Sequence, residues 1–157
     1  MALDFPDSPT NGEYYEGFVF DTATSVWRIR PIIGYPSATG GTIVTSGGYK
    51  YHTFTSTGTL SAVVSGYAEV LLIGGAGGGG GSGANYNSGG GGGAGGLIAF
   101  STLLESETNY TLTVGTGGAG GNATWGTSGV DTVGFGIIGL GGGGGGYSGQ
   151  NGRSGGS

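Results

Sequence analysis

The chain passes from an apolar strand into glycine at Val70-Leu71-Leu72-Ile73-Gly74-Gly75-Ala76-Gly77-Gly78. Glycine makes up 44 of the 157 residues, and only nine of these glycines come before Gly74. A glycine side chain offers no acid, base or nucleophile, but glycine lets backbones approach closely and adopts positive φ readily. We therefore expect the function of the second half to lie in its architecture and its surface contacts.

The sequence Gly-Gly-Ala-Gly-Gly occurs three times, at 74–78, 92–96 and 117–121, and each copy lies close to a short apolar segment. The unequal spacing of the copies excludes a fixed-period solenoid, and collagen would need glycine at every third position with abundant proline. Bare backbones can instead pack side by side as polyglycine II helices, which have polyproline II geometry and bond laterally. The apolar segments 97–100 and 137–140 would offset the entropy that glycine loses on ordering.

Composition favours order over disorder for this half, because hydrophobic residues total 35% and aromatic residues 11%. The stretch from Tyr147 onward is expected to be the least ordered part.

The charge balance argues against several classes of function. Charged residues are 8% of the chain, the formal net charge is −5, and the four cationic residues form no basic stripe. Nucleic-acid binding through phosphates is therefore not expected. The longest apolar run, 70–73, is too short to span a bilayer, so no membrane insertion is expected.

Catalytic, metal and cofactor sites are not predicted either. The chain has no cysteine, and His52 is its only histidine, so neither a thiolate site nor a histidine cluster can form within one chain. The close carboxylate pairs at 4/7 and 105/107 are interpreted as solvated loops, because a glycosidase pair needs a cleft and a set separation. Glycine runs without a following helix or a P-loop lysine carry no nucleotide signal.

Residues 1–36 form the first of three regions and contain all four prolines. Aromatic and β-branched residues predict strands over 14–20 and 25–30, with a turn at 21–24. A two-stranded hairpin is marginal alone in water, so its aromatic residues form either a small internal core or a plug seated in a partner. The plug is favoured.

Residues 37–73 form the second region and read as an all-β module. Short strands are expected over 42–45, 49–55, 60–64 and 67–73, separated by glycine turns. The last four residues of this region, 70–73, look buried on both faces. This spacing indicates a small β-sandwich, followed by the glycine-rich third region, 74–157, and no substantial α-helix anywhere.

The order of strands and glycine tracts resembles the glycine-rich domain of bacteriophage tail fibres and tail-tip adhesins. The residues that carry the resemblance are Val70–Gly78, Gly89–Ile98, Tyr110–Gly121 and Gly139–Gly146. It covers residues 40–157. In that family a β-strand module leads into packed polyglycine II helices whose connecting loops touch the host receptor.

The beginning of the chain is similar to the short N-terminal module of many phage fibre and structural proteins. The similarity lies in Ala2–Gly12, Phe20-Asp21 and Trp27-Arg28. It implies attachment to other virion proteins, of the tail or the capsid, through the N-terminal region. The candidate attachment residues are Phe5, Pro6, Pro9, Tyr15, Phe20, Trp27 and Arg28.

Polar and aromatic residues between the glycine tracts are the candidate receptor contacts. They are Asn85, Tyr86 and Asn87, together with Tyr147, Gln150 and Asn151. Tyrosine and asparagine on a glycine scaffold offer stacking area and adaptable hydrogen bonds to a host glycan or outer-surface protein. The alternative is that these are ordinary polar loops.

These observations together predict a non-enzymatic virion component, a short tail-fibre or tip-like protein made in the host cytoplasm and displayed on the phage particle. The resemblance to fibres implies a homotrimer. The alternative is a purely structural decoration or cement protein of the capsid or tail. An ice-binding or matrix protein is a weaker reading, because the N-terminal module has no place in it.

Overall fold

The computed structural model describes residues 8, 14–15, 18–21, 25–29, 36–83 and 88–156. This part of the chain consists of short strands and extended segments, and it contains no α-helix. The predicted all-β class is therefore confirmed. No helix in the described ranges is long and apolar enough to cross a membrane.

The N-terminal strands form an antiparallel sheet in the order β1-β2-β3. Its strands are β1 (Tyr14–Tyr15), β2 (Phe18–Asp21) and β3 (Val26–Ile29). Phe20 is the register partner of Trp27, and Val19 is the partner of Arg28. The expectation of a single strand over 14–20 is wrong, because β1 and β2 are two strands that pair antiparallel, whereas the strand expected over 25–30 corresponds to β3.

A second sheet holds most of the apolar core and has the strand order β10-β7-β4. Its strands are β4 (Ser37–Thr39), β7 (Gly58–Val64) and β10 (Asn109–Leu112). The buried residues Ala38, Leu60, Ala62 and Leu112 come from this sheet, and Leu104 joins them from the end of β9. Pairing of β7 with β10 brings together residues from the second and third sequence regions.

Strands β8 (Gly66–Ile73) and β9 (Leu97–Leu104) form a long two-stranded antiparallel sheet. Beside β8 lies a small hairpin of β11 (Thr132–Gly134) and β12 (Ile137–Gly139). The expectation that 70–73 is buried on both faces is wrong: Leu72 is buried, but Leu71 and Ile73 are 56% and 52% exposed. Only one face of this sheet is covered, so its side chains alternate between core and surface.

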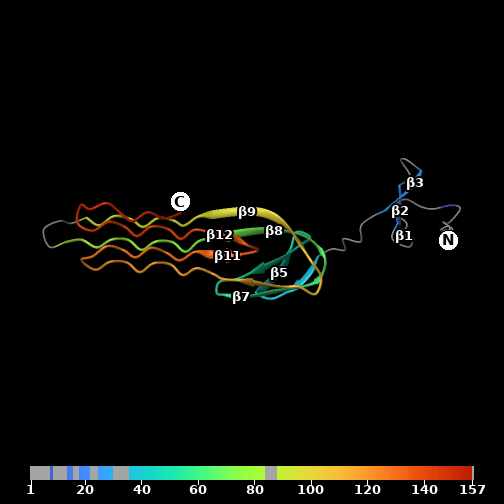
Figure 1. Cartoon of the computed structure of the whole chain (residues 1–157), viewed down its shortest axis with the longest axis horizontal. Coiled ribbons are helices and arrows are strands. Elements are labelled where there is room, and N and C mark those ends of the chain that lie inside the picture. The colour runs from blue at the N-terminus through green and yellow to red at the C-terminus, as the bar shows by residue number, and fades with distance from the viewer. Residues whose placement is uncertain are drawn as a thin grey trace.

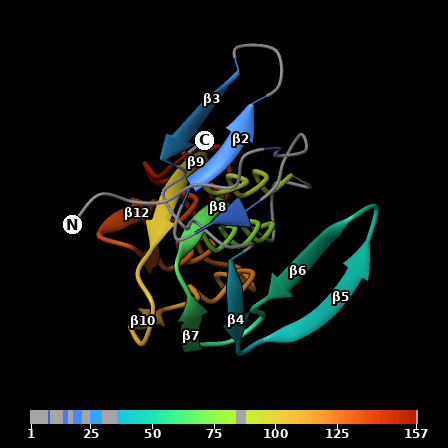
Figure 2. The same ribbon diagram turned by 90° about the vertical axis from the view of Figure 1, so that its right-hand side faces the viewer.

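Among the described strands, β5 (Thr42–Ser46) and β6 (Tyr49–Thr53) pair only with each other. The turn between them uses Gly47 and Gly48, both with positive φ, as two-residue hairpin loops require. Figure 2 shows this hairpin projecting away from the other strands. Its residues are exposed, except for the half-buried His52.

Six extended segments form a bundle that continues from the strands in Figure 1. We number them I (74–83), II (88–96), III (114–121), IV (124–131), V (140–147) and VI (150–156). Along segment I, the amides of Gly74, Gly77 and Gly80 donate to segment II, at 2.8 Å each. The amides of Gly75 and Gly78, one residue on, donate to segment IV at 2.9 Å. A repeat of three residues with lateral bonding is the pattern of packed polyglycine II helices.

Segment V lies at the centre of the bundle, bonded to segments I, II, IV and VI. Its residues Gly141–Gly146 are all buried. A Cβ on Gly142 would overlap the carbonyl oxygen of Gly93, and one on Gly144 would overlap that of Gly126. The run of six glycines is required because a three-residue helix with neighbours on every side has no row free for side chains.

Segment VI runs back along segment V. The amide of Arg153 donates to the Gly144 carbonyl at 2.7 Å, and that of Gly156 donates to Gly141 at 2.8 Å. Residues 150–156, which belong to the stretch expected to be the least ordered, are thus bonded to the central segment. Gly152 and Gly155 lie against the backbone of segment V and make this close approach possible.

Candidate functional site

The candidate site lies at the end of the bundle remote from the strands, where the turns joining its segments gather (Figure 1). One turn joins segments V and VI. The amide of Gln150 donates to the Tyr147 carbonyl at 2.9 Å, and both central residues, Ser148 and Gly149, have positive φ. These are the features of a type I′ turn, which holds Tyr147 and Gln150 close together.

An aromatic pair is the main feature of this end. The rings of Trp125 and Tyr147 lie 5.8 Å apart between centroids, tilted by 54°. The indole Nε1 of Trp125 donates to the backbone carbonyl of Asn151 at 3.3 Å. Trp125 keeps 41% of its surface exposed, so the pair offers accessible aromatic surface near two exposed residues of the turn and segment VI, Gln150 and Asn151.

Side chains at every third position of segment IV contact segment V, and this repeat fixes the position of Trp125. Asp131 Oδ1 accepts a bond from the Gly141 amide at 2.7 Å, and Ser128 Oγ accepts one from the Gly144 amide at 3.4 Å. Trp125 and Tyr147 form the next step, because segments IV and V run antiparallel with the same three-residue repeat. Glycine at 126 and 129 fills the row that faces the bundle.

Three of the six predicted receptor contacts, Tyr147, Gln150 and Asn151, are brought together here. The other three, Asn85, Tyr86 and Asn87, lie outside the described residues. Gly83 lies against the Tyr147 hydroxyl and the Ser148 side chain.

The sequence analysis did not single out Trp125 as a contact residue. The available signal was the three-residue spacing of Trp125, Ser128 and Asp131 around Gly126 and Gly129. Read with polyglycine II geometry, that spacing puts the three side chains on one row.

The predicted attachment residues lie in the N-terminal region, and the structure describes only some of them. Phe5, Pro6 and Pro9 lie outside the described residues. Tyr15, Phe20, Trp27 and Arg28 lie in strands β1 to β3, and their attachment role stays a prediction.

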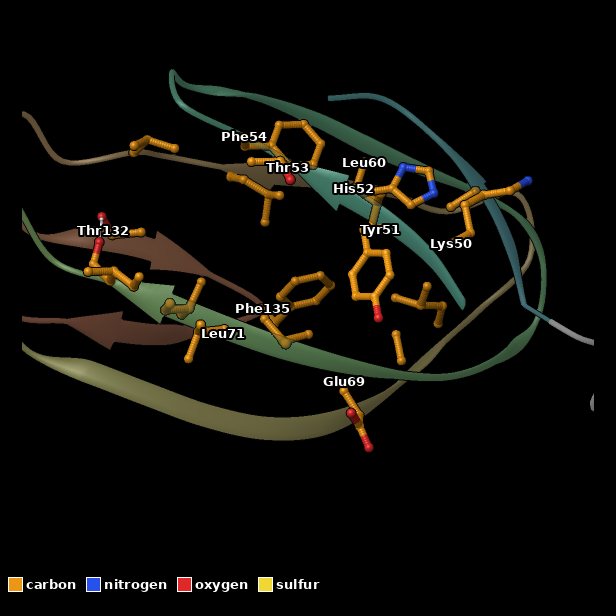
Figure 3. Close-up of a pocket in the computed structure, with 18 of the residues that line it drawn as sticks. Lys50, Tyr51, His52, Thr53, Phe54, Leu60, Glu69, Leu71, Thr132 and Phe135 are labelled. Atoms are coloured by element: carbon orange, nitrogen blue, oxygen red, sulfur yellow. Dashed lines mark hydrogen bonds between the residues drawn. The ribbon is translucent and has the colours of Figure 1, made fainter. Parts of the chain in front are cut away.

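A hollow of about 510 Å³ lies between β6, β7, β8 and β11. Its lining is mostly apolar, and Figure 3 shows the rings of Tyr51 and Phe135 pointing toward it. His52, also in the lining, donates from Nδ1 to the Gly40 carbonyl at 2.8 Å. The hollow has no converging set of polar groups, so the bundle end remains the better candidate.

Within the described ranges, no three His, Cys, Asp or Glu side chains are grouped so that they could hold a metal ion. The chemistry that the bundle end does offer is ring stacking and hydrogen bonding by amides, which suits contact with sugars or with a protein surface.

Comparison with known proteins finds a similarity in the glycine-rich part of the chain. A family model described as a glycine-rich domain matches residues 52–157, from within β6 to the end of the chain. No curated protein and no solved structure matches it. The matched range includes β7 and β8 together with their partners β10 and β9, so strands and bundle fall within one match. The chain belongs to the glycine-rich domain family.

Proposed function

We propose that this chain is a non-enzymatic phage virion component, a short tail-fibre or tip-like protein. Residues 1–36 attach it to other virion proteins of the tail or capsid. The loop end of the bundle contacts a glycan or protein on the host surface. The chain is made in the host cytoplasm and works on the surface of the particle.

The observation that carries the contact role is the Trp125–Tyr147 pair at the tip of the bundle, in which Trp125 is exposed and Tyr147 half-buried. The segments beneath it pack backbone against backbone, with lateral bonds of 2.7–3.0 Å. Because backbone atoms fill the interior of such a scaffold, the bundle does not need the two aromatic rings for its packing. It holds them at its end, where a ligand can reach them. Rigid aromatic anchors lose little conformational entropy on binding, and tryptophan and tyrosine are enriched among residues that dominate binding energy.

The test is adsorption of phage that carry Trp125→Ala or Tyr147→Ala. We expect each change to weaken adsorption at least ~30-fold, because truncating an anchor residue removes about 2 kcal/mol or more of binding energy. The matched control is Val130→Ala, an exposed residue of the same segment as Trp125 but near its other end. Particles should assemble normally in all three cases.

Adsorption that stays at the wild-type level in both aromatic variants would overturn the receptor role. The result would then favour the alternative, a decoration or cement protein of the capsid or tail. That alternative draws on the many hydrophobic side chains that remain exposed on the strands.

A further inference from the structure

The described part of the chain leaves most of its large apolar side chains uncovered. Six hydrophobic residues are buried, and two of these are alanines, whereas sixteen large hydrophobic residues are exposed. Single exposed hydrophobic residues are ordinary, but contiguous apolar patches mark surfaces that bind something. The question is whether these sixteen residues gather in one place.

Five of them share the outer face of the β8–β9 sheet. Tyr67, Leu71 and Ile73 of β8 are register partners of Leu103, Ala99 and Leu97 of β9. The five large residues, Tyr67, Leu71, Ile73, Leu97 and Leu103, are 63%, 56%, 52%, 63% and 44% exposed. They lie at alternate positions of two paired strands and form one apolar patch that the exposed Glu69–Ser101 pair interrupts.

The sheet of β4, β7 and β10 shows which side chains this protein has on a sheet face that is exposed to solvent. On β7 and β10, the outward positions opposite the buried Leu60, Ala62 and Leu112 include Thr59, Ser61, Asn109 and Thr111, with Val63 as the apolar exception. Hydroxyl and amide groups suit solvent, and an apolar patch does not. The contrast within one small module indicates that the outer face of β8–β9 is covered by a partner.

The charge on the outer face of β8–β9 indicates what kind of surface covers it. Glu69, paired with Ser101, is the one charged residue on the patch and lies between Tyr67 and Leu71. If this face packed on itself through a two-fold axis near its centre, two carboxylates would meet in apolar surroundings. A partner surface of opposite charge avoids this cost.

The β5–β6 hairpin of this chain carries a positive charge, that of Lys50. One of its faces carries Ile43, Thr45, Lys50 and His52, and Ile43 is 46% exposed. Lys50 is one of only four cationic residues in the sequence, and Figure 3 shows its side chain and that of Glu69 pointing away from each other. A two-stranded hairpin that pairs with none of the other described strands also needs external support.

We propose that the outer face of β8–β9 binds a second copy of this chain, whose β5–β6 hairpin lies across it with Lys50 beside Glu69. The contact joins two different surfaces, so it repeats head to tail and closes into a ring where the rotation permits. The apolar patch supplies the binding energy, and the Lys50–Glu69 pair sets the orientation. This inference is independent of the receptor role of the bundle end.

The experiment measures the molar mass of the full chain in solution, by sedimentation over a range of concentrations, for four proteins. Wild type should associate. Glu69→Lys and Lys50→Glu should each weaken association at least ~10-fold, as expected when like charges replace a pair at an interface. The double variant, Glu69→Lys with Lys50→Glu, should restore it, and misfolding could not produce that restoration.

The matched control is Glu105→Lys, which reverses an exposed carboxylate just beyond the end of β9. It should associate like wild type. A wild-type chain that stays monomeric at every concentration overturns the inference, as do single charge reversals that leave association unchanged. Failure of the double variant to recover overturns the assignment of the hairpin as the partner of this face.

Discussion

Gly142 and Gly91 are the same residue type in the same bundle, but they have different surroundings. Gly142 is buried in segment V, where an added Cβ would overlap the carbonyl oxygen of Gly93. Gly91 is exposed on segment II, its φ is not positive, and an added Cβ would meet no atom within 4 Å. At the residue scale, the place of a glycine on the three-residue repeat decides whether it can be replaced.

We expect Gly142→Ala to destabilise the bundle by at least about 3 kcal/mol, the upper end for overpacking, because backbone atoms cannot move aside as a side chain can. Gly91→Ala should stabilise it by roughly 0.4–1 kcal/mol, since alanine restricts the unfolded chain and fits the native backbone. Urea unfolding of the two variants and wild type measures both effects. Equal changes in the two variants would contradict the packing described for segment V.

The extended segments differ in how many of their three rows consist of glycine. Segment V is glycine throughout Gly141–Gly146 and is surrounded. Segment II keeps serine, glycine and alanine on its outward row, at 88, 91 and 94. Segment IV has glycine only at 126 and 129, and its other rows carry side chains. At the element scale, glycine on all three rows accompanies full burial in segment V, whereas segment IV bonds to segments I, III and V with a single glycine row.

Amide hydrogen exchange along segment I should follow the same three-residue repeat. The amides of Gly74, Gly75, Gly77, Gly78, Gly80 and Gly81 donate to neighbouring segments, whereas within the described residues those of Ala76 and Gly79 have no acceptor. We expect protected amides in pairs, each followed by one that exchanges fast. Nuclear magnetic resonance of the exchanging protein measures this directly. Uniform exchange along the segment would contradict a packed bundle.

The strands could be located from sequence because alternation and glycine turns are local signals. Residues 42–45 and 67–73 were expected as strands, and β5 and β8 agree within one residue at each end. Burial was harder to predict: 70–73 is apolar throughout, but tertiary packing covers only one face of the β8–β9 sheet and leaves Leu71 and Ile73 exposed. Pairing is set by contacts distant in sequence, which local patterns do not report.

The candidate site was only partly predictable for the same reason. Tyr147, Gln150 and Asn151 stand out as side chains after a glycine run, and they adjoin through a single turn. Trp125 joins them from another segment, through a register that depends on how segments IV and V align. That alignment follows from the bonds of Ser128 and Asp131 to segment V, which the sequence alone does not specify.

The whole molecule combines two ways of building an interior. The strands bury a few apolar side chains around Leu60 and Leu112, and the bundle buries backbone around Gly141–Gly146. Figure 1 shows the two parts end to end, with the turns of the bundle farthest from the strands. Side chains are therefore free to vary at the bundle turns without disturbing what lies inside.

A backbone interior also changes how stability responds to temperature. Exposing apolar surface raises the heat capacity of unfolding and exposing polar surface lowers it, so an ordinary protein of this length shows a rise of about 2 kcal/mol/K. Buried peptide groups replace buried hydrocarbon around Gly141–Gly146, so calorimetry should find a rise well below that value. A value at or above that of ordinary proteins would contradict a backbone interior. With a small heat capacity change, the stability curve is flat, and the bundle should lose little stability on cooling, where proteins held by apolar burial weaken.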